Sequence, residues 1–220
     1  MTSPKHTPSV SRREWLVLGG LLGAATLGGT AIRRLRPVGE AAADSPVLRA
    51  ARAAAGPEAG NRQGSVTLIV FTDFNCPACR RAHPDMLAAA TADGDTRLCF
   101  LDWPIFGDDS RAAAKIAIAA DAQGLYLPVH SALMRGGRAD GAAAERALLA
   151  AGGDLAVLQE TLRRQQSRIE GELSRNAVHA FSLGLGGTPG HLVGRVLLRG
   201  AASEGEFRRA IRRARSLGPD

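Results

Sequence analysis

The sequence has little of what a disulfide-stapled protein needs, because only three of its 220 residues are cysteines. Three cysteines cannot form a disulfide framework, so that class of small secreted scaffold is excluded. Aromatic residues are scarce as well, at 4% of the chain. A hydrophobic content of 45% over 220 residues is nevertheless enough for one domain with a real core.

A basic stripe on the folded part of the chain is also missing. The net charge is +7, but the first 43 residues hold six basic and two acidic residues, so the remaining chain carries only +3. A nucleic-acid-binding protein needs a basic face on a folded domain. Because the arginines here lie in the leader or are spread along predicted helices, we exclude nucleic acid as a partner.

Residues 1–43 have the layout of a targeting segment. Basic residues come first, then a glycine-containing apolar stretch over 16–32, then the small residues 41–43 (AAA) that suit a cleavage site. Residues 11–16 (SRREWL) resemble the twin-arginine signal, whose pathway carries folded cargo. We therefore predict a signal peptide and a periplasmic or other extracytoplasmic location. The alternative is an uncleaved membrane anchor, although 17 apolar residues are short for a span.

The order of predicted elements indicates the fold class. A short helix and linker occupy residues 44–64, and a β-branched run over 65–71 predicts a buried strand. A helix and a second strand follow it, which together make a βαβ unit with parallel strands. Residues 105–183 have mostly helical patterns, and two short apolar runs separated by Gly194-Arg195 predict a hairpin before a closing helix.

This order predicts an α/β, thioredoxin-like fold with an all-helical insertion between its βαβ and ββα halves. The predicted boundaries are 65–104 for the N-terminal half, 105–183 for the insertion and 184–216 for the C-terminal half.

The segment Cys76-Pro77-Ala78-Cys79 follows the first predicted strand and opens a helix. Disulfide exchange needs a thiolate, and the unpaired N–H groups and dipole of a helix N-terminus favour an anion at Cys76. Pro77 suits the first helical turn, where its missing N–H costs nothing. Cys79 lies one turn further and is expected to be the more shielded thiol. The pattern predicts Cys76 as the attacking and Cys79 as the resolving cysteine, with no cofactor.

The alternative function is a metal-binding or metallochaperone module that uses Cys76, Cys79 and His83. A zinc site of this kind needs a second pair of ligands, and the other histidines of the predicted domain show no paired spacing. A strand followed by C-x-x-C and a helix also favours redox chemistry. A degenerate binding protein without catalysis is a third possibility, which the intact cysteine pair disfavours.

Three segments resemble the DsbA-like thiol–disulfide oxidoreductases. Residues 71–79 (FTDFNCPAC) resemble their active-site strand and helix start, residues 103–107 (WPIFG) the loop after their second strand, and residues 187–189 (GTP) their cis-proline loop. The resemblance covers most of residues 64–215. It implies a cis peptide bond between Thr188 and Pro189, which places the Thr188 backbone beside Cys76, where it can pair with an extended substrate.

The resemblance implies an exported protein thiol–disulfide oxidoreductase. Its partners would be exported proteins with cysteines and a membrane or soluble redox partner, while oxidase, reductase and isomerase roles stay open. The sequence departs from the family at Gly190-His191, and Ala78 replaces the histidine of strongly oxidising members. A less oxidising protein is therefore expected.

Five further residues were candidates for support of the site or of the core. Asp73 is either a carboxylate that assists proton transfer or a solvated loop residue that caps the helix. His191 is either a cation near Cys76 or, the interpretation we favour, a strand residue with its ring in solvent. We predict His83 on the surface, Cys99 as a small buried apolar residue, and Trp103 packed between its loop and the helical insertion.

Overall fold

The computed structural model describes residues 37–218, so the signal or anchor predicted in the leader lies almost entirely outside the described residues. No helix within residues 37–218 is long and apolar enough to cross a membrane. The elements in chain order are β1 (Glu40–Ala41), α2 (Pro46–Arg52), β2 (Glu58–Gly60), β3 (Val66–Thr72), α3 (Pro77–Asp93), β4 (Thr96–Asp102), α4 (Asp108–Ala120), the 3-10 helix η1 (Asp121–Gln123), α5 (Tyr126–Arg135), α6 (Gly141–Ala150), α7 (Leu155–Ser182), β5 (Gly190–Val193), β6 (Val196–Arg199) and α8 (Glu204–Ser216).

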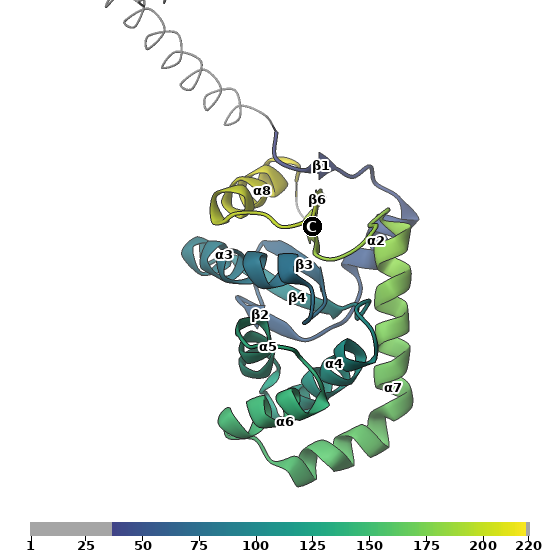
Figure 1. Ribbon diagram of the computed structural model, residues 1–220. Helices are drawn as coiled ribbons and strands as arrows, with labels where there is room; N and C mark the ends of the chain where they lie inside the picture. Colours follow the sequence, from purple (N-terminus) through teal and green to yellow (C-terminus); the bar gives the residue numbers. More distant parts are fainter. Residues whose placement is uncertain (1–36, 219–220) are drawn as a thin grey trace, which may run out of the picture. The chain divides into compact units, whose positions relative to one another are not determined.

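The strands form one mixed sheet in the order β1-β6-β5-β3-β4-β2 (Figure 1). Strands β3 and β4 are parallel, from Val66 opposite Thr96 to Thr72 opposite Asp102, and the other pairs are antiparallel. All seven residues of β3 are buried, which explains why its sequence is a β-branched run without polar alternation.

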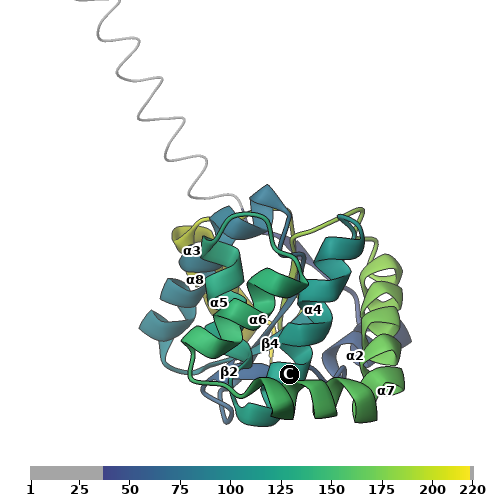
Figure 2. The same ribbon diagram turned by 60° about the horizontal axis from the view of Figure 1, so that its bottom comes forward.

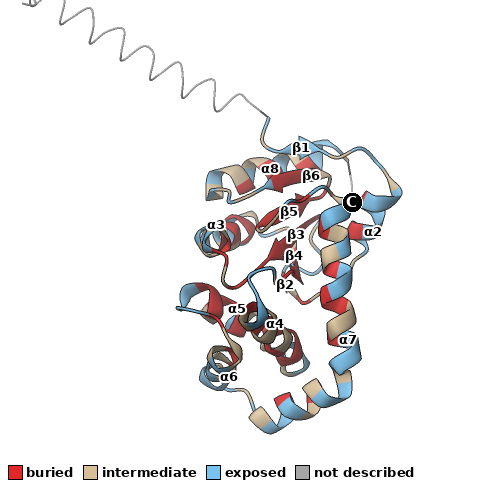
Figure 3. Cartoon of the chain, turned by 45° about the vertical axis from the view of Figure 1, so that its right-hand side comes forward, coloured by how far each residue is buried: buried red, intermediate tan, exposed pale blue. Residues whose placement is uncertain are grey.

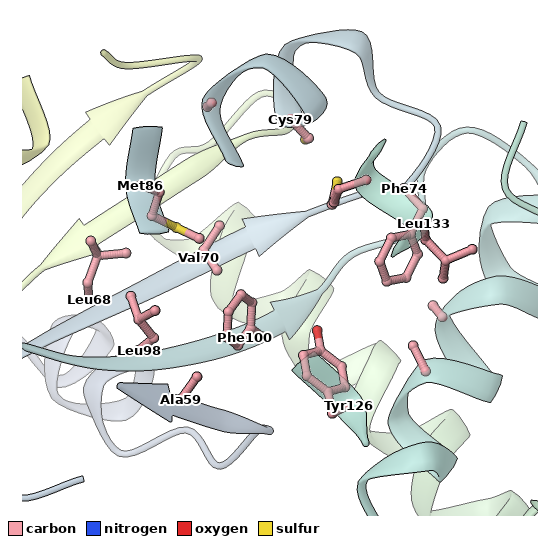
Figure 4. Close-up of a cluster of buried hydrophobic side chains, with 14 of the residues drawn as sticks. Ala59, Leu68, Val70, Phe74, Cys79, Met86, Leu98, Phe100, Tyr126 and Leu133 are labelled. Atoms are coloured by element: carbon pink, nitrogen blue, oxygen red, sulfur yellow. The ribbon is translucent and has the colours of Figure 1, made fainter. Parts of the chain in front are cut away.

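Alternate side chains of β3 point to opposite faces of the sheet, and helices cover both faces. Leu68 and Val70 lie in a core with α3, α8 and helices of the insertion, where Figure 4 shows Leu68 beside Leu98 and Val70 beside Phe100. Ile69 and Phe71 pack on the other side, against α2 and the end of α7. Figure 3 shows the strands buried between these helical layers.

The predicted α/β fold with a helical insertion is confirmed. Between β4 and β5 the chain is almost wholly helical, and α4 packs on α5, α6 and α7 (Figure 2). Helix α4 begins after Gly107, whose φ of 94° favours glycine, and no side chain caps it. Ser110, in the first turn of this helix, donates its hydroxyl to the Asp73 carboxylate.

The segment predicted as a plain linker contributes an edge strand. Glu58 to Gly60 pair antiparallel with β4, and Glu58 also accepts from Arg97 at 3.1 Å. Three residues without apolar alternation do not predict a strand. They form one because the edge of β4 has unpaired backbone N–H and C=O groups with which they can pair.

The opposite edge of the sheet involves the predicted cleavage site. Ala41 pairs with Val196 of β6, and the Ala42 amide donates to the Arg195 carbonyl at 2.8 Å. Cleavage within residues 41–43 remains a prediction, and it would remove this short strand from the sheet.

Candidate active site

The end of β3 and the start of α3 position the two cysteines. Cys76 is the N-cap residue of α3, with extended backbone angles of −76° and 116°, and Pro77 opens the helix. The Cys76 sulfur accepts from the Cys79 amide at 3.4 Å. The first turn of the helix thus directs a backbone N–H at this sulfur. Figure 4 shows Cys79 at the start of the helix, above the core that contains Val70 and Met86.

The loop before β5 meets the cysteines from the other half of the fold. The Thr188–Pro189 peptide bond is cis, as the resemblance implied. The Cys76 thiol donates to the Thr188 carbonyl at 3.2 Å, across 112 residues of sequence. The Thr188 backbone therefore adjoins the sulfur that is predicted to attack.

Both cysteines are 2% exposed as residues, so exposure does not separate them and the better shielding of Cys79 stays a prediction. Burial raises the pKa of Cys79 to about 12, although the Asp73 backbone and the hydroxyls of Thr188 and Thr72 act in the opposite direction. The Thr188 hydroxyl faces this sulfur without the geometry of a formed hydrogen bond. In the reduced protein Cys79 is therefore held as a neutral thiol.

The carboxylate of Asp73 holds loops together, which corrects its interpretation as a solvated cap. The residue is 1% exposed. Its oxygens accept from the amides of Ile105 at 2.6 Å and Phe106 at 2.9 Å, from the Ser110 hydroxyl at 2.8 Å and from the Asn75 amide at 2.7 Å. These four hydrogen bonds fix the residues 103–107 loop against the active-site loop.

Sequence reasoning missed Asn75, the residue that precedes the first cysteine. Its amide nitrogen donates to the Ala139 carbonyl at 2.7 Å and to the Ser110 hydroxyl at 2.9 Å, while its oxygen accepts from the Ala139 amide at 2.8 Å. These contacts join the active-site loop to the connection between α5 and α6. An asparagine before a cysteine carries no signal for a partner 64 residues away.

Arg80, one residue after Cys79, makes a second connection to the same segment. Its guanidinium donates to the Phe74 carbonyl at 2.6 Å and to the Gly136 carbonyl at 2.8 Å, and it also contacts the Gly137 carbonyl. The active-site loop is thus bound to the helical insertion by two side chains that flank the cysteines.

Replacing Asn75 with alanine should lower the free energy of unfolding by about 2 kcal/mol, because Ala139 loses both of its partners in a partly buried loop. Urea denaturation measures this change. Asn61→Ala is the matched control, since the Asn61 side chain bonds only at the exposed surface and its loss should cost less than about 1 kcal/mol. Equal losses in the two variants would contradict the connecting role of Asn75.

Two histidines lie elsewhere than predicted. His191 is 1% exposed, and its ring meets the edge of Phe207 at 4.8 Å, so the expected solvent position is wrong. Burial lowers the pKa of His191 to about 3, and a neutral ring supplies no cation to Cys76. His83, predicted on the surface, is 5% exposed, and its Nε2 atom pairs with the Ser131 hydroxyl at 3.2 Å. Both errors arise because single histidines on helices and strands carry no burial signal.

The metal-binding alternative finds no support in the described part of the chain. Within residues 37–218 no three His, Cys, Asp or Glu side chains are grouped to hold a metal ion.

The loop after β4 combines a buried anchor with exposed apolar residues. Trp103 is 4% exposed and meets the edge of Phe181 of α7 at 5.1 Å, so the predicted packing of this loop on the insertion is confirmed. Ile105 and Phe106 are 43% and 51% exposed. Cys99 behaves as a buried apolar residue in β4, and burial raises the pKa of its thiol to about 11.

A C-x-x-C pair at a helix start, opposite a cis-proline loop that leads into a hairpin, defines the thioredoxin-like class of redox proteins. The profile of the thioredoxin family matches residues 53–213. A thioredoxin-like oxidoreductase from Silicibacter pomeroyi DSS-3 is 33% identical over 79% of this chain and 99% of its own, with a TM-score of 0.71. The thiol-disulfide exchange protein alpha-DsbA2 from Wolbachia pipientis is 26% identical over 74% and 87% of the two chains, with a TM-score of 0.68.

A periplasmic thioredoxin-like protein from Salmonella enterica serovar Typhimurium shares the fold, at 22% identity over 79% and 99% of the two chains and a TM-score of 0.67. Comparison with the curated proteins gave no match. The chain belongs to the thioredoxin family and is a DsbA-like protein thiol–disulfide oxidoreductase.

Proposed function

We propose that this oxidoreductase is exported and exchanges disulfides with cysteines of exported proteins, with Cys76 as the attacking and Cys79 as the resolving thiol. One observation carries the assignment: the Cys76 sulfur lies between the N-terminus of α3 and the Thr188 carbonyl. The helix start directs the Cys79 amide at this sulfur, and a cysteine attacks as its thiolate. Cys79, held as a thiol by burial, is suited to act second.

The exchange proceeds in two sulfur displacements. In the reducing direction, the Cys76 thiolate attacks a substrate disulfide, forms a mixed disulfide and releases one substrate thiolate. Cys79 then loses its proton and attacks the Cys76 sulfur, which closes the protein disulfide and releases the second substrate thiolate. In the oxidising direction the same steps run in reverse, so no cofactor enters the balance.

Exposed groups around the cis-proline loop suit an unfolded protein segment as substrate. The Thr188 backbone can pair with an extended chain beside Cys76. Ile105 lies against Gly187, with its Cδ1 atom 3.9 Å from the place where a Cβ of that glycine would lie. The exposed side chains of Ile105 and Phe106 thus offer apolar contacts next to the reactive sulfur.

The proposed location rests on the leader and on the periplasmic protein from Salmonella that shares the fold. Replacing Arg12 and Arg13 together with lysine should leave the precursor in the cytoplasm, because the twin-arginine pathway requires the arginine pair. Cell fractionation followed by immunoblotting measures the result. The control changes Arg33 and Arg34 to lysine, a pair that follows the apolar stretch, and should be exported normally. Normal export of the Arg12 and Arg13 variant would exclude this pathway.

A further inference from the structure

A small internal cavity of about 10 Å³ lies beside Cys79 and Pro189, and three histidines line it. They come from three elements: His83 from α3, His130 from α5 and His191 from β5. The three residues are 5%, 1% and 1% exposed. The rings of His83 and His130 are in contact, with centroids 4.9 Å apart. The fold thus collects buried imidazoles around the resolving thiol.

Four of the six ring nitrogens of this histidine cluster lack a hydrogen-bond partner in the described part of the chain. Within residues 37–218, Nδ1 of His83, both nitrogens of His130 and Nδ1 of His191 are buried without a hydrogen bond. Buried polar groups are normally paired with protein or with ordered water. A cavity of this size has room for one water molecule, which needs two to four polar partners. The residues that line the cavity carry four such unpaired nitrogens.

Cys79 needs a route by which protons leave and reach its sulfur without passing the face where a substrate is joined to Cys76. Its thiol must lose a proton before it attacks the mixed disulfide, and its thiolate must regain one when the protein disulfide opens. The residue is only 2% exposed. A substrate joined to Cys76 covers the approach from that side, whereas the histidine cluster adjoins Cys79 from within.

We propose that His83, His130 and His191, with one water molecule in the cavity, form the proton path of the resolving thiol. The inference rests on the roles proposed for the two cysteines. During resolution the Cys79 S–H bond breaks, its proton passes to the water and the imidazoles, and a proton leaves toward solvent past Ser131, which is 8% exposed and hydrogen-bonded to His83. The Cys79 thiolate forms its bond to Cys76, and the electron pair of the broken disulfide leaves with the substrate thiolate.

Neutral imidazoles suit such a path, because each ring can accept a proton at one nitrogen while it donates from the other. Burial, with Arg135 nearby, lowers the pKa of His83 to about 4. Burial and the neighbouring His83 lower the pKa of His130 well below its usual value. Tyr126 packs on His130, and the Tyr126 hydroxyl donates to Asp102.

The lifetime of a mixed disulfide with glutathione tests the path. Reduced protein is mixed with oxidised glutathione, quenched with acid at intervals and analysed by mass spectrometry. In His130→Leu the glutathione adduct on Cys76 should persist about tenfold to a hundredfold longer at pH 7, because general acid–base assistance to Cys79 is lost. The first step, attack by Cys76, should keep its rate within about twofold. The delay should shrink as pH rises, since hydroxide then removes the Cys79 proton directly.

His179→Leu is the matched control, because His179 lies half-buried on α7 and does not line the cavity. It should resolve the adduct at the native rate. An unchanged adduct lifetime in His130→Leu, or equal slowing of both steps, would overturn the proposal. If His130→Leu does not fold, His191→Gln, which keeps a polar side chain but not the ring, is judged by the same lifetimes. Failure of the native protein to form any adduct on Cys76 would instead refute the proposed cysteine roles.

Discussion

Replacement of Cys79 by alanine will leave Cys76 in long-lived mixed disulfides with substrate proteins. The helix start that holds the Cys76 sulfur is unchanged in this variant, so the first displacement still proceeds. The second cannot, because the resolving thiol is gone. Turnover with a disulfide substrate should fall roughly a thousandfold or more, as expected when a residue that reacts covalently is removed. Non-reducing gels of cells that express a tagged protein, followed by mass spectrometry, detect the trapped partners.

The remaining cysteines provide the controls for this trapping experiment. Cys76→Ala should trap nothing, and Cys99→Ala should behave like the native protein, because Cys99 lies in β4 and its sulfur contacts the Ala54 carbonyl rather than the active site. Trapping by Cys76→Ala together with its absence in Cys79→Ala would reverse the assigned roles. Identification of only cytoplasmic proteins in the trapped complexes would contradict export.

Lowering the pH from 7 to 5 should destabilise the protein by up to about 6 kcal/mol, about 2 kcal/mol for each of its three buried histidines. The histidine cluster stays neutral in the folded chain, since its pKa values lie below the usual 6.5, at about 4 for His83 and about 3 for His191. The unfolded chain takes up those protons as pH falls below 6.5. Each histidine therefore removes about 2 kcal/mol by pH 5, and stability continues to fall toward the folded pKa values.

One buried carboxyl partly offsets this loss. Burial raises the pKa of Asp102 well above its usual value, so the folded state gains stability relative to the unfolded state as pH falls toward 3.8. Urea unfolding at pH 7 and pH 5 measures the balance. In His191→Gln the difference between the two pH values should shrink by about 2 kcal/mol, because one depressed titration is removed. A pH dependence identical to that of the native protein would show that His191 is not held neutral by the fold.

Local sequence patterns were sufficient for much of the fold. The apolar run of β3, the hairpin of β5 and β6, and the amphipathic closing helix each have a residue pattern that a short window of sequence contains. The active-site cysteines and Pro189 are likewise found in short motifs. The cis bond at Pro189 required the resemblance, since an isolated X-Pro bond is usually trans.

Contacts between distant segments could not be predicted in the same way. Asn75 and Ala139 are 64 residues apart, and the histidine cluster forms only when α3, α5 and β5 pack together. Strand β2 exists because β4 offers an open edge, not because residues 58–60 prefer a strand. The buried position of Asp73 similarly depends on backbone amides of the loop after β4. In each case the local conformation is determined by a partner that lies elsewhere in the sequence, so a local pattern does not predict it.

The connection between the active-site loop and the helical insertion has a consequence for how such sequences can diverge. On the active-site side, these hydrogen bonds come from the side chains of Asp73, Asn75 and Arg80. On the insertion side, the partners are mainly backbone groups, such as those of Ala139 and Gly136. Every amino acid except proline carries both backbone groups. Substitutions in the insertion can therefore accumulate without breaking these bonds, as long as the path of its backbone is kept. Family members should vary freely in this segment while its main chain still fixes the position of the reactive sulfur.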